Sequence, residues 1–305
     1  MLNLSSLVAG LKRRYFRHEF GMRCRAVFDT PPVELDESSG LVVLSQTYHP
    51  DLIMYLVAAK SFAKHIKPAL FVIVDDGLLP EDRALIRKHL KKVEFLNRSS
   101  VPNSVCPMGG TWERLLSVAD LCERYYVVQL DSDTVTLRLP TEVAERIRGG
   151  EAFTLPTRMG KAFVPVVEAS ATARQMESQH VQIEAEIALG KIEALADTFY
   201  IRGCSGFAGF PKGCMRRSEL ERFSLLMEQF LGRARWSQWG TEQVASNYMI
   251  ANVASRGTLP FEQYPYWKRG ADISAAALVH FIGDDRFTST AYTRTAIQII
   301  NGMKL

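Results

Sequence analysis

The sequence predicts an α/β fold in which a mixed, mainly parallel sheet is flanked by helices. Two short apolar runs rich in β-branched residues, 41–45 and 70–74, are separated by residues 51–66, whose apolar positions recur at helical spacing. A third run, 125–130, follows directly after a segment with one apolar helical face, 112–122. Continuous apolar strands joined by helices are typical of parallel sheets that are covered on both faces. The 305 residues, 47% of them hydrophobic, can bury a core of this size.

The remaining segments continue the alternation of strand and helix. In chain order we expect a helix that opens at Pro80 and runs to 91, a strand at 93–96, short glycine-broken strands at 204–210, helices at 218–231 and 241–251, and a last strand at 277–282. Residues 166–199 are rich in Ala, Glu and Gln and predict a helical insertion. Because no linker interrupts the chain, we expect a single domain over 36–305 behind a basic N-terminal extension, 1–35.

Charge argues against one class of partner and marks one end of the chain. The chain has 37 basic and 33 acidic residues, so its net charge of +4 is too small to predict nucleic-acid binding. Basic residues are concentrated at 12–25, together with aromatic ones. This segment could rest on an anionic membrane face as a basic helix, or it could be a solvated tail with a few docked aromatic side chains.

Cysteine content and hydropathy predict the compartment. The five cysteines are widely spaced and form no C-x-x-C pair, which favours reduced thiols and a cytoplasmic protein, peripheral at the inner membrane face if the basic segment binds there. The run KRRYF at 12–16 is similar to part of a twin-arginine signal, but no apolar region follows it. No stretch has the length of apolar residues that a membrane span requires. The oligomeric state is left open.

Two carboxylates follow the strand that ends at Leu130. Asp131 and Asp133 are two residues apart, and positions i and i+2 of an extended chain point to the same side, so their side chains can converge. A divalent cation would offset their mutual repulsion. Ligands of open α/β sheets bind at the carboxyl ends of strands, where both residues are expected. Asp75 and Asp76 end a neighbouring strand in the same way, although they could instead only form a turn before Gly77.

A late histidine could complete this site. His280 lies on the last apolar strand and begins an H-x-x-G-x-x-R pattern with Gly283 and Arg286. One imidazole and two carboxylates suit Mn²⁺ or Mg²⁺. The alternative is a core histidine whose ring is satisfied by a backbone carbonyl.

The run WERLLSVADLCERYYVVQLDSDTV, the β-α-β start before it and HFIGDDR near the end together resemble the GT-A glycosyltransferases, most closely the family-8-type group that includes glycogenin and galactosyltransferases. The resemblance covers about residues 40–290. It implies the GT-A, Rossmann-like nucleotide-diphospho-sugar transferase fold. In that group the D-x-D motif and a late histidine bind Mn²⁺, so Asp131, Asp133 and His280 are the implied metal ligands.

The resemblance also implies an activity. This is the metal-dependent transfer of a hexose, with retention, from a nucleotide-sugar (a UDP-sugar is favoured) to a glycan, lipid or small-molecule acceptor. If Glu242 acted as a base, inversion would be expected instead. The family ending H-x-x-G-x-x-K-P-W is altered here, with Arg286 at the lysine position and Phe287 where the Pro-Trp pair begins. Arginine can still neutralise a diphosphate.

Catalytic residues are implied in the same way. Glu242 and Gln243 resemble the Asp-Gln pair near the reacting sugar, although Thr241 and Glu242 could merely begin a helix. Arg114 matches an arginine that approaches the donor, and a solvated helix face is its alternative.

Donor and acceptor contacts complete the implied site. The donor-binding set is Ser45, Thr47, Asp75, Asp76, Arg114, Ser132, Gly283 and Arg286. The acceptor side would be lined by 205–209 and the insertion 166–199, and a sugar-stacking rim could come from Trp236, Trp239, Tyr264, Tyr266 and Trp267, which could equally be core residues.

Two other functions fit parts of the sequence. Residues 131–135 also match the D-x-D-x-[TV] motif of haloacid-dehalogenase-type phosphatases, in which Asp131 would be the nucleophile, Asp133 the general acid, and Asp131 and Asp285 the Mg²⁺ ligands. A GT-A domain that binds a nucleotide or glycan without turnover is the second alternative.

Overall fold

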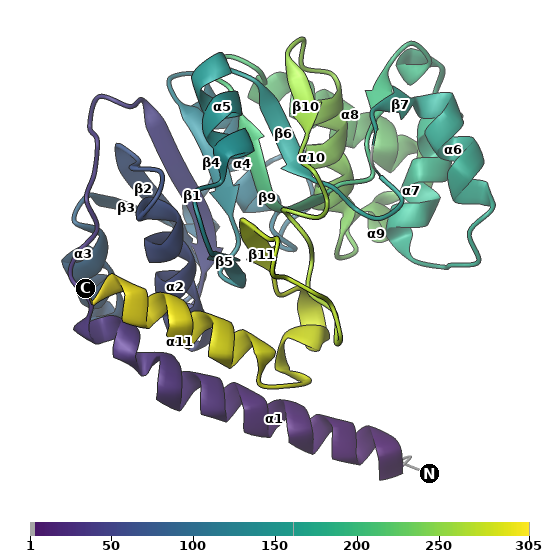
Figure 1. Cartoon of the computed structure of the whole chain (residues 1–305). Helices are drawn as coiled ribbons and strands as arrows, with labels where there is room; N and C mark the ends of the chain where they lie inside the picture. The colour runs from purple at the N-terminus through teal and green to yellow at the C-terminus, as the bar shows by residue number, and fades with distance from the viewer. Residues whose placement is uncertain (1–3, 161, 305) are drawn as a thin grey trace.

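The computed structural model describes residues 4–160 and 162–304, and it is built on a seven-stranded sheet (Figure 1). The strand order is β10-β6-β9-β4-β1-β2-β3. In chain order the strands are β1 (Leu41–Thr47), β2 (Leu70–Asp75), β3 (Val93–Asn97), β4 (Tyr126–Leu130), β6 (Ala152–Leu155), β9 (Cys204–Phe210) and β10 (Arg256–Thr258). Strand β1 pairs in parallel with β2 and β4, β2 with β3, and β6 with β10, whereas β9 is antiparallel to both β4 and β6. The predicted mixed, mainly parallel sheet is confirmed.

Helices cover both faces of the sheet because successive strand side chains point to opposite sides. Leu41 and Val43 of β1 belong to one buried cluster, and Val42 and Leu44 belong to the other. The first cluster packs under α1 (Leu4–Cys24), α2 (Leu52–Ala63), α3 (Pro80–Leu90), α5 (Thr141–Gly149) and α11 (Ala291–Met303). The second packs under α4 (Trp112–Cys122), α6 (Val166–Arg174), α7 (Val181–Leu189), α8 (Arg217–Leu231), α9 (Arg233–Trp236) and α10 (Thr241–Ala251).

The predicted insertion forms a helical unit at one end of the sheet. Helices α6 and α7 pack on each other, and the short pair β7 (Val164–Pro165) and β8 (Phe199–Tyr200) joins the ends of the unit. Figure 1 places it at the opposite end of the molecule from α3. Short 3-10 turns complete the chain: η1 (Arg25–Asp29), η2 (His49–Asp51), η3 (Arg98–Ser100), η4 (Glu193–Leu195) and η5 (Gly283–Phe287).

A second, two-stranded sheet lies outside the main one. It pairs β5 (Thr134–Thr136) with β11 (Leu278–His280) in antiparallel register, so that His280 lies opposite Thr134. The last strand is therefore shorter than the predicted 277–282, because the chain turns into η5 at Gly283, where φ is +57°.

The N-terminal segment is a helix that packs on the last helix of the chain. Figure 1 shows α1 beside α11 at the outer edge of the molecule. Phe20 is buried and stacks on Tyr292 with ring centroids 4.4 Å apart, and Cys24 and Val27 are buried as well. Residues 1–3 of the predicted extension 1–35 lie outside the described residues, and the domain boundary after residue 35 stays a prediction. Within the described residues, no helix combines the length and the apolar character needed to cross a bilayer.

Phe20→Ala should lower the free energy of unfolding by about 3–5 kcal/mol, because the substitution leaves a cavity against Tyr292. Urea unfolding followed by circular dichroism measures the change. Tyr15→Ala is the matched control, since Tyr15 is 65% exposed on the same helix and its loss should have little effect. Equal effects of the two substitutions would contradict the packing of α1 described here.

Candidate active site

The turn between β4 and β5 carries the D-x-D motif and is fixed by strands on both sides. The backbone N–H of Asp131 donates to the Gly206 carbonyl oxygen of β9 (2.8 Å), and the N–H of Phe281, which follows β11, donates to the Asp133 carbonyl oxygen (2.8 Å). The Thr134 hydroxyl donates to the Asp131 carbonyl oxygen (2.8 Å). The two carboxylates are therefore attached to a backbone that hydrogen bonds hold in place on both sides.

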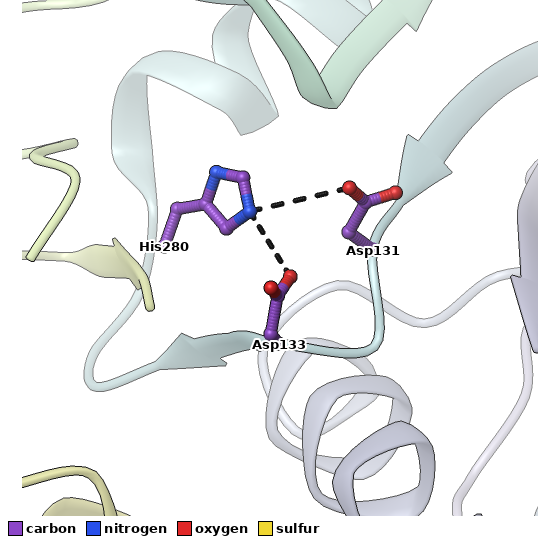
Figure 2. A group of neighbouring side chains, drawn as sticks. All are labelled: Asp131, Asp133 and His280. Atoms are coloured by element: carbon purple, nitrogen blue, oxygen red, sulfur yellow. Dashed lines mark hydrogen bonds and ion pairs between the residues drawn. The ribbon is translucent and has the colours of Figure 1, made fainter. Parts of the chain in front are cut away.

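His280 joins the two carboxylates across the small sheet. Its Nε2 lies 3.0 Å from Asp133 Oδ1 and 4.0 Å from Asp131 Oδ2, as Figure 2 shows. One ligand atom from each of the three side chains lies within 4.8 Å of the others. A divalent cation bound to ligands at about 2.0–2.6 Å can bridge atoms with this spacing. The residues present thus fit the divalent cation that the sequence predicts.

The His280 ring packs against a strand position that tolerates no side chain. A Cβ built at Gly206 would lie only 2.3 Å from His280 Cε1. Cys204, two residues earlier on β9, has its Sγ 3.5 Å from His280 Nδ1. The predicted acceptor-lining segment 205–209 therefore contains Gly206, against which the His280 ring packs.

Two arginines pair with the carboxylates. Arg114 of α4 forms an ion pair with Asp131, and Arg286 Nη1 of η5 donates to Asp133 Oδ2 (2.8 Å). Burial alone would raise the pKa of Asp133, but His280 and Arg286 outweigh burial and lower it. Burial would lower the pKa of His280, and the Asp133 carboxylate together with Cys204 instead raises it well above its usual value.

An open pocket of about 200 Å³ lies over this cluster. It is lined by Gln46, Thr47, Tyr48, Asp51, Asp76, Thr111, Arg114, Asp131, Ser132, Asp133 and Arg286. Four of these residues are acidic and two are basic, so with every carboxyl group ionised the lining has a formal charge of −2. An anionic ligand would be repelled from this lining unless a cation came with it.

Glu242 lies behind the pocket, in contact with Arg114. It is buried, its Oε1 is 3.5 Å from Arg114 Nη2, and its Oε2 accepts hydrogen bonds from the hydroxyls of Thr111 (3.0 Å) and Ser205 (3.1 Å). Burial, reinforced by the nearby Asp131 carboxylate, raises the pKa of Glu242. Gln243 Oε1 accepts from the Ser205 N–H (3.2 Å). Neither residue lines the pocket, and Glu242 is placed to orient Arg114.

Some residues of the implied donor set meet at the pocket. Thr47, Asp76, Arg114, Ser132 and Arg286 all line it. They come from the carboxyl ends of β1, β2 and β4, from the helix before β4 and from η5. Asp76 also accepts from Gln46 Nε2 (3.0 Å) and pairs with Arg98 (3.0 Å), which fix its position at the rim.

Three members of the implied donor set lie elsewhere. Ser45 is buried in β1, and its hydroxyl donates to the Leu130 carbonyl oxygen (2.7 Å). The Asp75 carboxylate accepts from the N–H groups of Gly77 (3.0 Å) and Leu78 (2.8 Å), the arrangement expected of the turn alternative. Gly283 lines a separate groove between α1 and η5.

Four pocket residues were not singled out from the sequence: Gln46, Tyr48, Asp51 and Thr111. The first three follow or end β1, so the rule applied to Asp75 and Asp131 at their strand ends could have found them. Thr111 has a positive φ of 75°, a conformation that is uncommon outside glycine and that clusters at functional sites. The Gly109-Gly110 pair before it was visible in the sequence, but the strain at Thr111 was not.

The aromatic residues considered for a sugar-stacking rim divide between core and surface. Trp236, Tyr264 and Trp267 are buried and belong to the core alternative, and Tyr266 is half-buried. Trp239 is 72% exposed, and its Cα lies 3.9 Å from a Cβ built at Gly110, next to the pocket residue Thr111. Trp239 is therefore the member of the group best placed to meet a ligand.

Comparison with known proteins finds the fold and not a sequence family. No protein-family model matches the chain, and no curated protein matches it. The structure of a bifunctional glycosyltransferase, WbbM, is similar to 86% of this chain at 12% identity with a TM-score of 0.53, and this chain spans about 50% of that protein.

Two further solved structures show lower scores. A galactosyltransferase, LgtC, in complex with donor and acceptor sugar analogues matches 86% of this chain and 95% of its own at 13% identity, with a TM-score of 0.46. Mouse xyloside xylosyltransferase 1 matches 83% of this chain and 99% of its own at 12% identity, with a TM-score of 0.48. At these identities the comparison establishes the GT-A glycosyltransferase fold, and the activity has to be argued from the site.

Gly206→Ala should lower the free energy of unfolding by about 1–3 kcal/mol, because the new methyl group would overlap the His280 ring. Chemical denaturation of the two proteins measures the difference. Gly21→Ala is the control, since a Cβ there meets nothing within 4 Å and alanine favours the α1 helix. A Gly206→Ala protein as stable as the parent would show that the histidine is not seated on β9.

Proposed function

We propose that this protein is a metal-dependent glycosyltransferase that takes a sugar from a nucleotide-diphosphate-sugar. The observation that carries the proposal is the Asp131, Asp133 and His280 cluster at the edge of a pocket formed at strand ends of a GT-A fold. Membership of the family-8-type group stays a prediction from the sequence.

The charge of the pocket supports a diphosphate ligand that arrives with a cation. Mn²⁺ or Mg²⁺ held by the cluster would supply two positive charges, which match the formal −2 of the lining. The cation would then neutralise Asp131 and Asp133, the carboxylates that Arg114 and Arg286 pair with. The two guanidinium groups could therefore donate to phosphate oxygens. Positive charge at the leaving diphosphate lowers the barrier to breaking the sugar–phosphate bond.

The nucleotide would extend from the cluster toward β1 and β2. Thr47 and Asp76 offer a hydroxyl and a carboxylate along that side of the pocket. Asp76 is held by Arg98 and Gln46, so it can accept a hydrogen bond from a ribose or a base without a rearrangement. A UDP-sugar remains the favoured donor, on the basis of the sequence resemblance.

The acceptor would bind beside Trp239. This side chain meets His180 edge-on, with ring centroids 6.2 Å apart, and Gln182 Nε2 of α7 donates to the neighbouring Gly240 carbonyl oxygen (3.1 Å). The helical insertion 166–199 thus supports the loop that borders the pocket. An exposed indole suits the apolar face of a glycan, a lipid-linked sugar or a small glycoside.

The position of Glu242 supports our proposal that the anomeric configuration is retained. Inversion needs a carboxylate base that can reach the acceptor hydroxyl, and Glu242 is buried behind Arg114 with both oxygens facing protein groups. We infer that Glu242 and Gln243 orient Arg114 and Ser205 rather than remove a proton. The cytoplasmic location and the absence of a nucleic-acid partner stay predictions from the sequence.

The phosphatase alternative has no support in the geometry. It requires Asp285 beside Asp131 as a magnesium ligand, but Asp285 does not line the pocket. Among the described residues, the three-residue cluster with metal-ligand spacing contains His280 in its place. A GT-A domain without turnover differs from an active enzyme in sugar transfer and not in donor binding, so activity has to be measured directly.

Asp133→Asn should abolish the Mn²⁺-dependent rise in melting temperature that a nucleotide diphosphate causes. A ligand that binds only the folded state stabilises it by about 2.7 kcal/mol at one hundred times its dissociation constant. We would measure melting with UDP, GDP, CDP and ADP, each with Mn²⁺ and with EDTA. The comparison is made within each variant, so any intrinsic loss of stability cancels.

Asp272→Asn is the matched control, because Asp272 is exposed, belongs to neither the cluster nor the pocket lining, and caps a local turn through Ser274. The control should keep the full metal-dependent shift. If Asp133→Asn also keeps it, the metal assignment is wrong. If the parent protein responds to none of the nucleotides with either Mn²⁺ or Mg²⁺, the donor class is wrong.

Trp239→Ala should raise the KM for a glycoside acceptor by roughly tenfold and leave the rate of donor hydrolysis unchanged. The reason is that Trp239 is exposed and its backbone lies next to Gly110, which precedes the pocket residue Thr111, while the residue itself does not belong to the pocket lining. A panel of alkyl glycosides supplies the acceptor, Trp239→Phe should restore most of the affinity, and Phe230→Ala, at another exposed aromatic residue, serves as control. An unchanged KM would remove Trp239 from the acceptor site.

A further inference from the structure

Helix α1 exposes an apolar stripe on the side opposite its buried residues, and two members of the stripe, Leu7 and Leu11, also line the groove between α1 and η5. Five side chains that are 43–65% exposed form it: Leu7, Val8, Leu11, Tyr15 and Met22. At 3.6 residues per turn they project within an arc of roughly 100°, which also contains the exposed His18. Phe20 and Cys24 are buried on the opposite side, against α11 and η5. The stripe is therefore not the face that packs the helix onto the protein.

Basic residues flank the stripe. The sequence of α1 contains five Lys or Arg residues and one acidic residue, Glu19. Arg14 projects next to Leu7 at one border of the stripe, and Lys12 projects beyond Val8 at the other. Arg13, Arg17 and Arg23 pair with Asp284, Asp51 and Glu19, and among the described residues no acid lies within ion-pair distance of Lys12 or Arg14.

The stripe is presented by a fixed helix. Arg13 Nη1 donates to Asp284 of η5 (2.6 Å), and Arg17 reaches Asp51 of η2, which lines the pocket (3.4 Å). With the stacking of Phe20 on Tyr292, these contacts hold α1 from Arg13 to Phe20. Figure 1 shows the N-terminal end of α1 projecting beyond the other elements, so the rest of the fold does not cover it.

The basic residues beside the apolar stripe indicate which kind of partner can bind to this face of α1. A second copy of the chain, paired through a two-fold axis, would bring the same basic borders together with only Glu19 to offset them. A partner protein with a strongly acidic surface would meet the charge but would need an apolar groove along the whole helix. An anionic lipid surface meets both requirements, because its headgroups attract the cations and its acyl boundary accepts the apolar side chains.

We propose that α1 is an interfacial helix that lies in the plane of an anionic membrane, with Leu7, Val8, Leu11, Tyr15 and Met22 inserted and Lys12 and Arg14 at the headgroups. The sequence left membrane contact through 12–25 and a solvated tail as alternatives, and the proposed surface differs from that segment because it also includes the exposed Leu7, Val8 and Leu11. This inference does not depend on the proposed sugar transfer.

The test is co-sedimentation of the full chain with vesicles of phosphatidylglycerol and phosphatidylcholine, and with vesicles of phosphatidylcholine alone. We expect binding to the anionic vesicles only, weakened at 1 M salt because screening shortens the reach of charge to about 3 Å. The double substitution Leu11→Glu and Tyr15→Glu should lower the bound fraction at least tenfold. Lys12→Glu with Arg14→Glu should have a similar effect on the anionic vesicles.

Leu225→Glu with Phe230→Glu is the matched control, because both residues are exposed apolar side chains of α8 and not of α1. It should bind vesicles as the parent does. Binding that survives the α1 substitutions, or no binding by the parent, overturns the proposal. The proposal is also overturned if the parent protein, without vesicles, is a dimer in analytical ultracentrifugation and the α1 substitutions dissociate that dimer. The nucleotide-dependent melting shift of each variant shows separately whether the donor site is intact.

Discussion

The geometry of the whole site depends on the turn between β4 and β5, which backbone hydrogen bonds hold from both sides. Asp131 is tied to β9 through the Gly206 carbonyl oxygen, and Asp133 is tied to the end of β11 through the N–H of Phe281. Both strands come from distant parts of the chain. They fix the two carboxylates within reach of His280. Folding therefore positions all three side chains before anything binds to them.

The two neighbouring carboxylates of this turn are stabilised by arginine side chains, which could pair with a bound ligand instead. Arg114 and Arg286 each pair with one carboxylate, and Glu242 behind Arg114 keeps that guanidinium in place through contacts with Thr111 and Ser205. A bound cation would take over the neutralisation of Asp131 and Asp133. The arginines would then face the pocket beside it, which is the arrangement a diphosphate requires.

The two ends of the chain are also connected to the site. Helix α1 packs on α11, and its arginines reach Asp51 at the pocket and Asp284 in the segment that carries Arg286. A helix that reads in the sequence as a basic extension is thus part of the structure around the pocket. Its apolar stripe lies on the side opposite the buried Phe20 and Cys24, and Leu7 and Leu11 of the stripe also line the groove beside η5.

The sequence by itself determined the layered α/β fold, because buried strands and amphipathic helices have distinct apolar periods, and it located the D-x-D turn at a strand end. It also marked His280 as a third ligand, but only the antiparallel pairing of β5 with β11 brings that ring to Asp133, across 147 positions (280 minus 133). Tertiary structure likewise decided that Ser45 and Asp75 satisfy backbone groups, that Glu242 lies behind Arg114, and that Trp239 is exposed while Trp236 is core. The physical reason is that periodicity reports local burial, whereas the partner of a polar side chain depends on contacts between segments far apart in the chain.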